Sequence, residues 1–189
     1  MNQHNPLMPT LSMVSKVTEM DMTMLDAKTK MMVLEALNDE YKARAFYRLV
    51  IKTFGPIRPF VNIVEAEETH ALALERLCER YGIPLPDDEW DRTLQPPASV
   101  LEACRAGVEG EIENIAMYDR FLKETEIPDI RGLFQRLQAR SRDAHLPAFQ
   151  RCVARGGETG GGRGQGEVPL HRTRADAGPA RFRRRGRIT

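Results

Sequence analysis

The chain has few cysteines, and their arrangement argues against the usual cysteine-based sites. Its 189 residues contain three, Cys78, Cys104 and Cys152, which are far apart and form no Cys-x-x-Cys pair. This spacing favours neither a zinc knuckle nor a disulfide framework. We therefore expect all three cysteines to be reduced and to serve as small apolar side chains in the core.

Long apolar runs are also missing. Hydrophobic residues make up 41% of the chain, and no stretch reaches the roughly 18 apolar residues that a membrane-spanning helix needs. The N-terminal residues show no basic cluster followed by an apolar stretch, so a secretory signal is not indicated. We expect one domain with no membrane segment, located in the cytoplasm.

Charge of one sign does not dominate the whole chain, but the C-terminal segment is basic and the rest of the chain is acidic. The formal net charge is +1, yet the segment from Arg155 onward carries nine arginines and three acidic residues, which leaves residues 1–154 at −5. Residues 156–189 are rich in Gly and Arg and almost without aliphatic side chains, so we expect a disordered basic tail. Residues 1–25 show no sustained periodicity and are expected to form a flexible arm.

Between these ends, over residues 26–155, the alternation typical of strands is missing and helical periodicity is strong. Apolar residues at steps of three and four predict four long helices. Their runs are Asp26 to Gly55, Arg58 to Gly82, Ser99 to Glu124, and Pro128 to Arg155. Ser99 and Glu102 have the spacing of a capping box. Pro147 predicts a kink or an early end in the fourth helix.

The connection lengths predict how these helices are joined. Two short links require antiparallel hairpins, whereas the 17 residues from Gly82 to Ala98 could extend over ~50 Å, further than the ~37 Å of a 25-residue helix. Two hairpins joined by one long crossover form the ferritin-like four-helix bundle. We therefore predict an all-α fold of this kind, in which Trp90 of the crossover covers an apolar patch.

Acidic and imidazole side chains fall on the apolar faces of the first two predicted helices. Glu40 lies within the stripe made by Val33, Leu37 and Tyr47. In the second helix Glu67 and His70 are three residues apart, so they project from one face. That face is the apolar one.

The other two helices repeat the pattern. Glu111 lies close to the apolar stripe that we predict for the third helix, formed by Val108, Ile112, Ile115, Tyr118 and Leu122. His145 lies at the edge of the apolar stripe of the fourth. Each helix therefore directs at least one metal-binding side chain inward.

Burying an ionised carboxylate without a partner costs several kcal/mol, so these positions need an explanation. A buried salt bridge is one, with Arg44 available as the cation. A bound metal ion is the other, and five residues would be its ligands: Glu40, Glu67, His70, Glu111 and His145. Oxygen donors mixed with imidazole suit iron, manganese or zinc.

Four short motifs in these helices resemble a known superfamily. They are "DEYKARAFY", "AEETH", "RYGIPLP" and "SRDAHLPAF". Together they resemble the ferritin-like di-iron carboxylate proteins, rubrerythrin above all, and more closely a prokaryotic ferritin-like family of unassigned function. The resemblance covers about residues 30–153. It implies a mononuclear or di-iron site, and a ferroxidase or peroxidase activity if two ions bind.

Two departures from that pattern limit what is implied. Rubrerythrin-like proteins carry a second Glu-x-x-His on the fourth helix, but here Arg142 stands three residues before His145, so the number of ions stays open. Asp143 is predicted to point away from the core. A rubredoxin-type domain with four cysteines is also lacking, so any turnover would need an external electron donor.

Two roles are open for two of the tyrosines. Tyr47 and Tyr118 lie in register with the five residues and could act as hydrogen-bond donors or one-electron donors at a catalytic site. They could instead be core residues with a satisfied hydroxyl group.

The whole chain also leaves alternatives open. It could be a non-catalytic metal-stabilised bundle, or an interaction protein whose basic tail binds nucleic acid. For each of these functions, and for the metal-binding oxidoreductase, we expect a homodimer, the default assembly of such bundles.

Overall fold

The computed structural model describes residues 25–158, and this part of the chain is all-helical, as predicted. The long helices are α1 (Ala27–Phe54), α2 (Phe60–Arg80) and α4 (Val100–Glu124). A last helical run comprises α5 (Pro128–Arg140), a π-helical turn η1 (Ser141–His145) and α6 (Leu146–Ala154). The expected arm and tail lie outside the described residues, except for Leu25, which is buried, and residues 156–158.

Side-chain caps and glycine set several of the helix ends. Asp26 precedes α1, and its carboxylate accepts the backbone N–H of Thr29 at 2.9 Å. Gly55 ends this helix with a φ of 87°, a conformation that glycine adopts without strain. Ser99 accepts the backbone N–H of Glu102 at 3.2 Å and so caps α4 as the sequence predicts.

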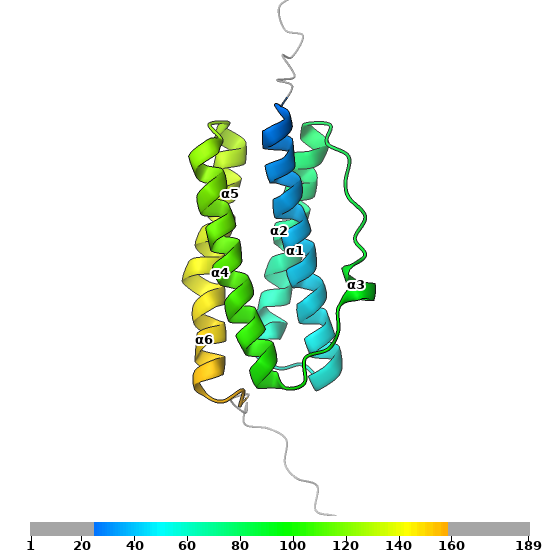
Figure 1. Cartoon of the computed structure of the whole chain (residues 1–189), viewed down its shortest axis with the longest axis vertical. Helices are drawn as coiled ribbons and strands as arrows, with labels where there is room; N and C mark the ends of the chain where they lie inside the picture. Colours follow the sequence, from blue (N-terminus) through cyan, green and yellow to red (C-terminus); the bar gives the residue numbers. More distant parts are fainter. Residues whose placement is uncertain (1–24, 159–189) are drawn as a thin grey trace, which may run out of the picture.

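The helices form two hairpins that lie side by side (Figure 1). One is α1 with α2, and the other is α4 with the α5–η1–α6 run. The segment between α2 and α4 runs along the outside and contains one short helix, α3 (Trp90–Thr93). Trp90 packs against the core as predicted, and its indole N–H donates to Asn38 Oδ1 at 3.0 Å.

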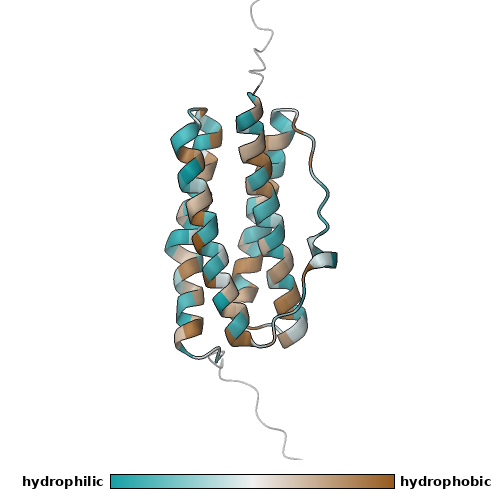
Figure 2. Ribbon diagram, in the orientation of Figure 1, coloured by the Kyte–Doolittle hydropathy of each residue, from teal (hydrophilic) through white to brown (hydrophobic). Residues whose placement is uncertain are grey.

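The core consists of two apolar clusters, and polar and apolar residues are interleaved along all the long helices (Figure 2). One cluster contains Leu37, Leu74 and Phe134, and the other contains Phe60 and Phe149. In each long helical run, residues of the two clusters lie toward opposite ends. The polar side chains discussed below lie between them.

The apolar face predicted for α4 is only partly confirmed, since Tyr118 is buried and Val108 and Leu122 pack against the core, whereas Ile112 does not. Ile112 is 52% exposed and Val108 is only partly buried. The buried face is rotated and carries small and polar residues: Ala103, Cys104, Gly107, Glu111, Asn114, Met117, Tyr118 and Phe121. Hydropathy placed the centre of this face too far toward Ile112, because the helix meets its neighbours partly through close contacts and a polar cluster. An ideal Cβ on Gly107 would lie 2.7 Å from the Phe149 ring.

The expectation of three reduced cysteines is wrong. Cys104 of α4 and Cys152 of α6 form a disulfide, with their Cα atoms 6.0 Å apart. Adjacent helices bring the two together, although 48 residues separate them in the sequence. Cys78 is free and buried.

The irregularity predicted near Pro147 is present, as the turn η1 just before it. Proline has no backbone N–H to donate into the preceding turn, so the regular hydrogen-bond ladder cannot continue through this position. The chain instead makes a wider turn and then resumes an α-helix up to Ala154. None of the described helices is long and apolar enough to cross a membrane.

Candidate metal centre

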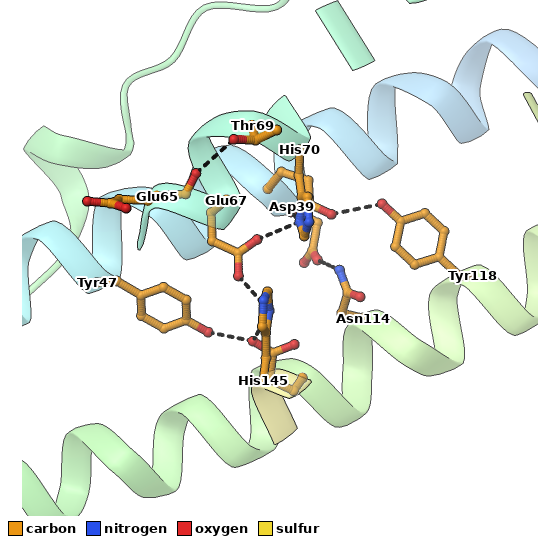
Figure 3. Close-up of polar contacts among 11 residues, drawn as sticks. Asp39, Tyr47, Glu65, Glu67, Thr69, His70, Asn114, Tyr118 and His145 are labelled. Carbon is orange, nitrogen blue, oxygen red and sulfur yellow. Dashed lines mark hydrogen bonds and ion pairs between the residues drawn. The ribbon is translucent and has the colours of Figure 1, made fainter. Parts of the chain in front are cut away.

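Side chains from α1, α2, α4 and the α5–η1–α6 run lie close together between the two apolar clusters (Figure 3). They are the five predicted from the sequence, with exposed fractions of 1% for Glu40, 3% for Glu67, 8% for His70, 3% for Glu111 and 2% for His145. Each lies on the face that its helix buries, so the charge is inside the protein. They form two overlapping groups.

The first group joins α1 and α2 and consists of Glu40, Glu67 and His70. His70 Nδ1 lies 3.2 Å from Glu40 Oε2 and 3.0 Å from Glu67 Oε2. One ligand atom from each residue lies within 4.8 Å of the others. A single cation could therefore contact all three.

The second group joins α2, α4 and η1 and consists of Glu67, Glu111 and His145. His145 Nδ1 lies 3.0 Å from Glu67 Oε1 and 3.5 Å from Glu111 Oε1. Glu67 thus belongs to both groups, with one carboxylate oxygen toward each histidine. The two imidazole rings are nearly parallel, with centroids 5.6 Å apart.

The two predicted tyrosines hold carboxylates of this cluster. Tyr118 Oη donates to Glu40 Oε1 at 2.9 Å, and Tyr47 Oη donates to Glu111 Oε1 at 3.0 Å. Burial raises the pKa of both phenols well above the usual value, and the surrounding carboxylates raise it further. Both groups therefore stay protonated at neutral pH and can serve as hydrogen-bond donors.

Arginine does not balance this buried charge. Arg44, the partner considered from the sequence, forms ion pairs with Glu68 at 3.2 Å and with Asp88 at 2.6 Å. Both of these carboxylates lie outside the cluster. Within the described residues, the salt bridges of Glu40, Glu67 and Glu111 involve only histidines.

Protons balance the charge instead when no metal is present. Burial lowers the pKa of both histidines, but the adjacent carboxylates outweigh it and raise the pKa of His70 to about 10 and that of His145 to about 9. Burial and the charge of Glu67 raise the pKa of Glu40 to about 7. The pKa of Glu67 is lowered, because the interactions of its carboxylate with the two histidines outweigh its burial.

His145 shows that protons do not satisfy the cluster completely. Neither of its ring nitrogens has a hydrogen-bond partner among the described residues, although both are buried. Nδ1 contacts the carboxylates of Glu67 and Glu111 as ion pairs, at 3.0 Å and 3.5 Å. Buried polar atoms are rarely left in this state. A cation between the imidazole and the carboxylates would satisfy them, so the residues present fit a metal ion.

The turn η1 explains why Arg142 does not oppose such an ion. In an α-helix, the residue three before His145 would share its face. The wider π turn moves Arg142 off this face and keeps Ser141, four residues before His145, inward, where it is buried. Arg142 is exposed and pairs with Asp143, which points away from the core as predicted.

Two polar residues at the edge of the cluster were missed in the sequence. Asn114 is buried, and its Nδ2 donates to Asp39 Oδ2 at 2.7 Å. Burial raises the pKa of Asp39 to about 6. A signal was available, because Asn114 follows Glu111 by three residues and Asp39 precedes Glu40. It was hidden because the apolar face of α4 was placed too far toward Ile112.

The chain is similar to a known protein in sequence and in structure, and it matches one family model. The chain is 26% identical over 136 residues to uncharacterized protein MJ0754 of Methanocaldococcus jannaschii, which covers 64% of this chain and 72% of that protein. The crystal structure of hypothetical protein MJ0754 is similar with a TM-score of 0.64 at 25% identity, covering 71% of this chain and 85% of that one. A family model described as "Uncharacterized protein domain (DUF2202)" matches residues 28–162. The chain therefore belongs to the DUF2202 family.

Proposed function

We propose that this protein is a ferritin-like four-helix bundle that binds two first-row divalent metal ions, iron or manganese, at the buried cluster. The observation that carries the proposal is the position of Glu67, whose two carboxylate oxygens face two separate ligand groups, each with one further glutamate and one histidine. Carboxylate and imidazole donors suit these metals, and zinc as a third candidate. The two hairpins around an inward carboxylate cluster support the ferritin-like assignment.

The activity that this site supports best is the oxidation of ferrous iron by peroxide or dioxygen. Two ferrous ions, as substrates, would each give one electron to hydrogen peroxide, which takes up two protons and leaves as two water molecules. Carboxylate oxygens are hard donors that favour the ferric product. Tyr47 and Tyr118 would hold Glu111 and Glu40 in position for the ions. Repeated turnover would need an external electron donor.

Metal content tests the site. After growth with added iron or manganese, the native chain should retain about two equivalents of metal, as in di-metal carboxylate bundles. Glu67→Ala should retain almost none, because both groups lose a ligand. Glu65→Ala is the matched control, since this exposed carboxylate lies on the same helix. Equal metal in all three proteins would refute the proposal, provided that circular dichroism shows the same helix content.

A second experiment separates redox activity from structural binding. Anaerobic loading with ferrous iron and then one addition of peroxide should give ferric near-ultraviolet absorbance faster than for free iron. Metal retained without this acceleration would favour the alternative in which the ions only neutralise the cluster and stabilise the fold.

A further inference from the structure

A cavity of about 370 Å³ leads to the buried cluster between α1 and α4. Tyr47 and Ser141 line it near the cluster, and Leu94 of the crossover lines it as well. Its charged lining contains one ammonium group, that of Lys42, and six carboxylates: Asp39, Glu40, Glu67, Glu109, Glu111 and Glu113. Such a cavity attracts cations and repels anions.

The carboxylates of this cavity become progressively more buried. Glu109 and Glu113 are exposed, Asp39 is half-buried, and Glu40 and Glu111 are buried. A cation moving from solvent toward the cluster would therefore meet negative charge at each depth. Its attraction would increase inward, because water screens the buried charges less.

Part of the way along this cavity lies an oxygen atom that has no hydrogen-bond partner among the described residues. Asn114 lines the cavity and is 6% exposed, and its Oδ1 has no hydrogen-bond partner among the described residues. Its Nδ2 is already committed to Asp39, so the opposite amide orientation would bring two oxygens together (Figure 3). An amide oxygen beside a carboxylate is a hard donor pair that suits a divalent cation.

We propose that this cavity is the route by which divalent cations reach the buried centre, and that Asp39 and Asn114 form a transient binding site on it. The inference rests on the proposed function, since it assumes that the centre takes up metal. It adds a role for two residues outside the five ligands. These two act on the rate of loading and not on the final amount of metal.

Gly110 allows the route to be blocked without disturbing the packing. It lines the cavity, and a Cβ built on it meets no atom within 4 Å. A leucine at this position would extend into open space and obstruct the cavity. Helix propensity also favours leucine over glycine, so the variant should fold. Gly110→Ala is the matched control, because its side chain is too small to obstruct the passage.

Stopped-flow mixing of metal-free protein with Co²⁺, followed by visible absorbance, tests the route. Gly110→Leu and Asn114→Leu should load about tenfold more slowly than the native chain, as expected when an attractive path is lost. Both should reach the native number of equivalents, and Gly110→Ala should load at the native rate.

Other results would overturn the inference. Native loading rates in both leucine variants would show that cations enter elsewhere. Fewer equivalents in folded Asn114→Leu at equilibrium would make Asn114 part of the centre and not of a route. A native chain that takes up no Co²⁺ would instead refute the proposed function, and the route with it.

Discussion

Single residues in the centre are arranged so that protons and metal ions compete for the same atoms. His70 and His145 carry raised pKa values of about 10 and about 9 because they face buried carboxylates. A metal ion can bind an imidazole only where a proton has left. Metal binding at neutral pH should therefore release protons from this cluster.

The same pKa values predict how the stability of the metal-free protein depends on pH. A group whose pKa is raised by folding contributes stability that is fully present below its unfolded pKa, 6.5 for histidine, and that is lost as pH rises through the folded value. Glu40, raised from 4.5 to about 7, acts in the same direction. The thermal midpoint of the chelator-treated protein should therefore fall between pH 6.5 and pH 10.

Metal-loaded protein is the control for this measurement, since it retains the same lysines and tyrosines. A bound ion replaces the titrating protons, so its midpoint should depend on pH much less over this window. A midpoint of the metal-free protein that stays constant or rises would contradict the assignment of protonated histidines.

The residue scale is also where the sequence was most informative. An ionised side chain within an apolar stripe is costly, so Glu40, Glu67 and His70 could be picked out individually, and the structure brings them together. Their role as ligands stays a prediction. Asn114 carries no charge, so only its spacing of three residues from Glu111 could have placed it inside.

At the scale of elements, α4 shows that a helix can bury small and polar side chains together with its large apolar ones. Gly107 and Gly110 are three residues apart on this helix but have different surroundings. A Cβ on Gly107 would overlap the Phe149 ring at 2.7 Å, whereas one on Gly110 would meet nothing within 4 Å. Close approach of α6 at Gly107 therefore contributes, beside hydropathy, to which side of α4 faces inward.

Alanine substitutions at these two glycines should therefore have opposite effects on stability. Gly107→Ala should lower the free energy of unfolding by about 1–3 kcal/mol, the usual cost of overpacking. Gly110→Ala should raise it by up to about 1 kcal/mol, because alanine is the better helix former. Urea unfolding followed by circular dichroism measures both. Equal effects of the same sign would show that helix propensity alone governs the two sites.

The last helical run shows a limit of prediction from periodicity. Pro147 predicted an irregularity in the helix but not its type. A kink, the end of the helix and a π-helical turn can all accommodate a proline, which lacks a backbone N–H. The type decides that Ser141 is buried and Arg142 exposed. Counting residues at a fixed helical period therefore did not show that Arg142 would point to solvent.

At the scale of the whole molecule, the all-helical fold followed from helix patterns and link lengths, whereas the disulfide did not. Two cysteines 48 residues apart reveal nothing of their proximity until α4 and α6 are placed next to each other. The expectation of a cytoplasmic protein is not tested by the structure. Disulfides are, however, rare in reducing compartments.

The disulfide should contribute substantially to stability. Closing a loop of this length removes unfolded-state entropy worth about 4 kcal/mol, so a Cys104→Ala, Cys152→Ala variant should be destabilised by about that amount. Cys78→Ala is the control, because Cys78 is buried but unpaired.

Thiol counting checks the bond directly. Protein denatured without reductant should show one reactive thiol, and three after reduction. Three thiols in the unreduced sample would show that the bond does not form in solution.

The shared carboxylate of Glu67 has a consequence for how the centre fills. Once an ion occupies one group, the other is left with a carboxylate whose charge is already partly neutralised, and with a positive neighbour. The two binding steps should then have unequal affinities, although each group offers two glutamates and one histidine. A titration should be biphasic, and a half-filled protein should accumulate at substoichiometric metal.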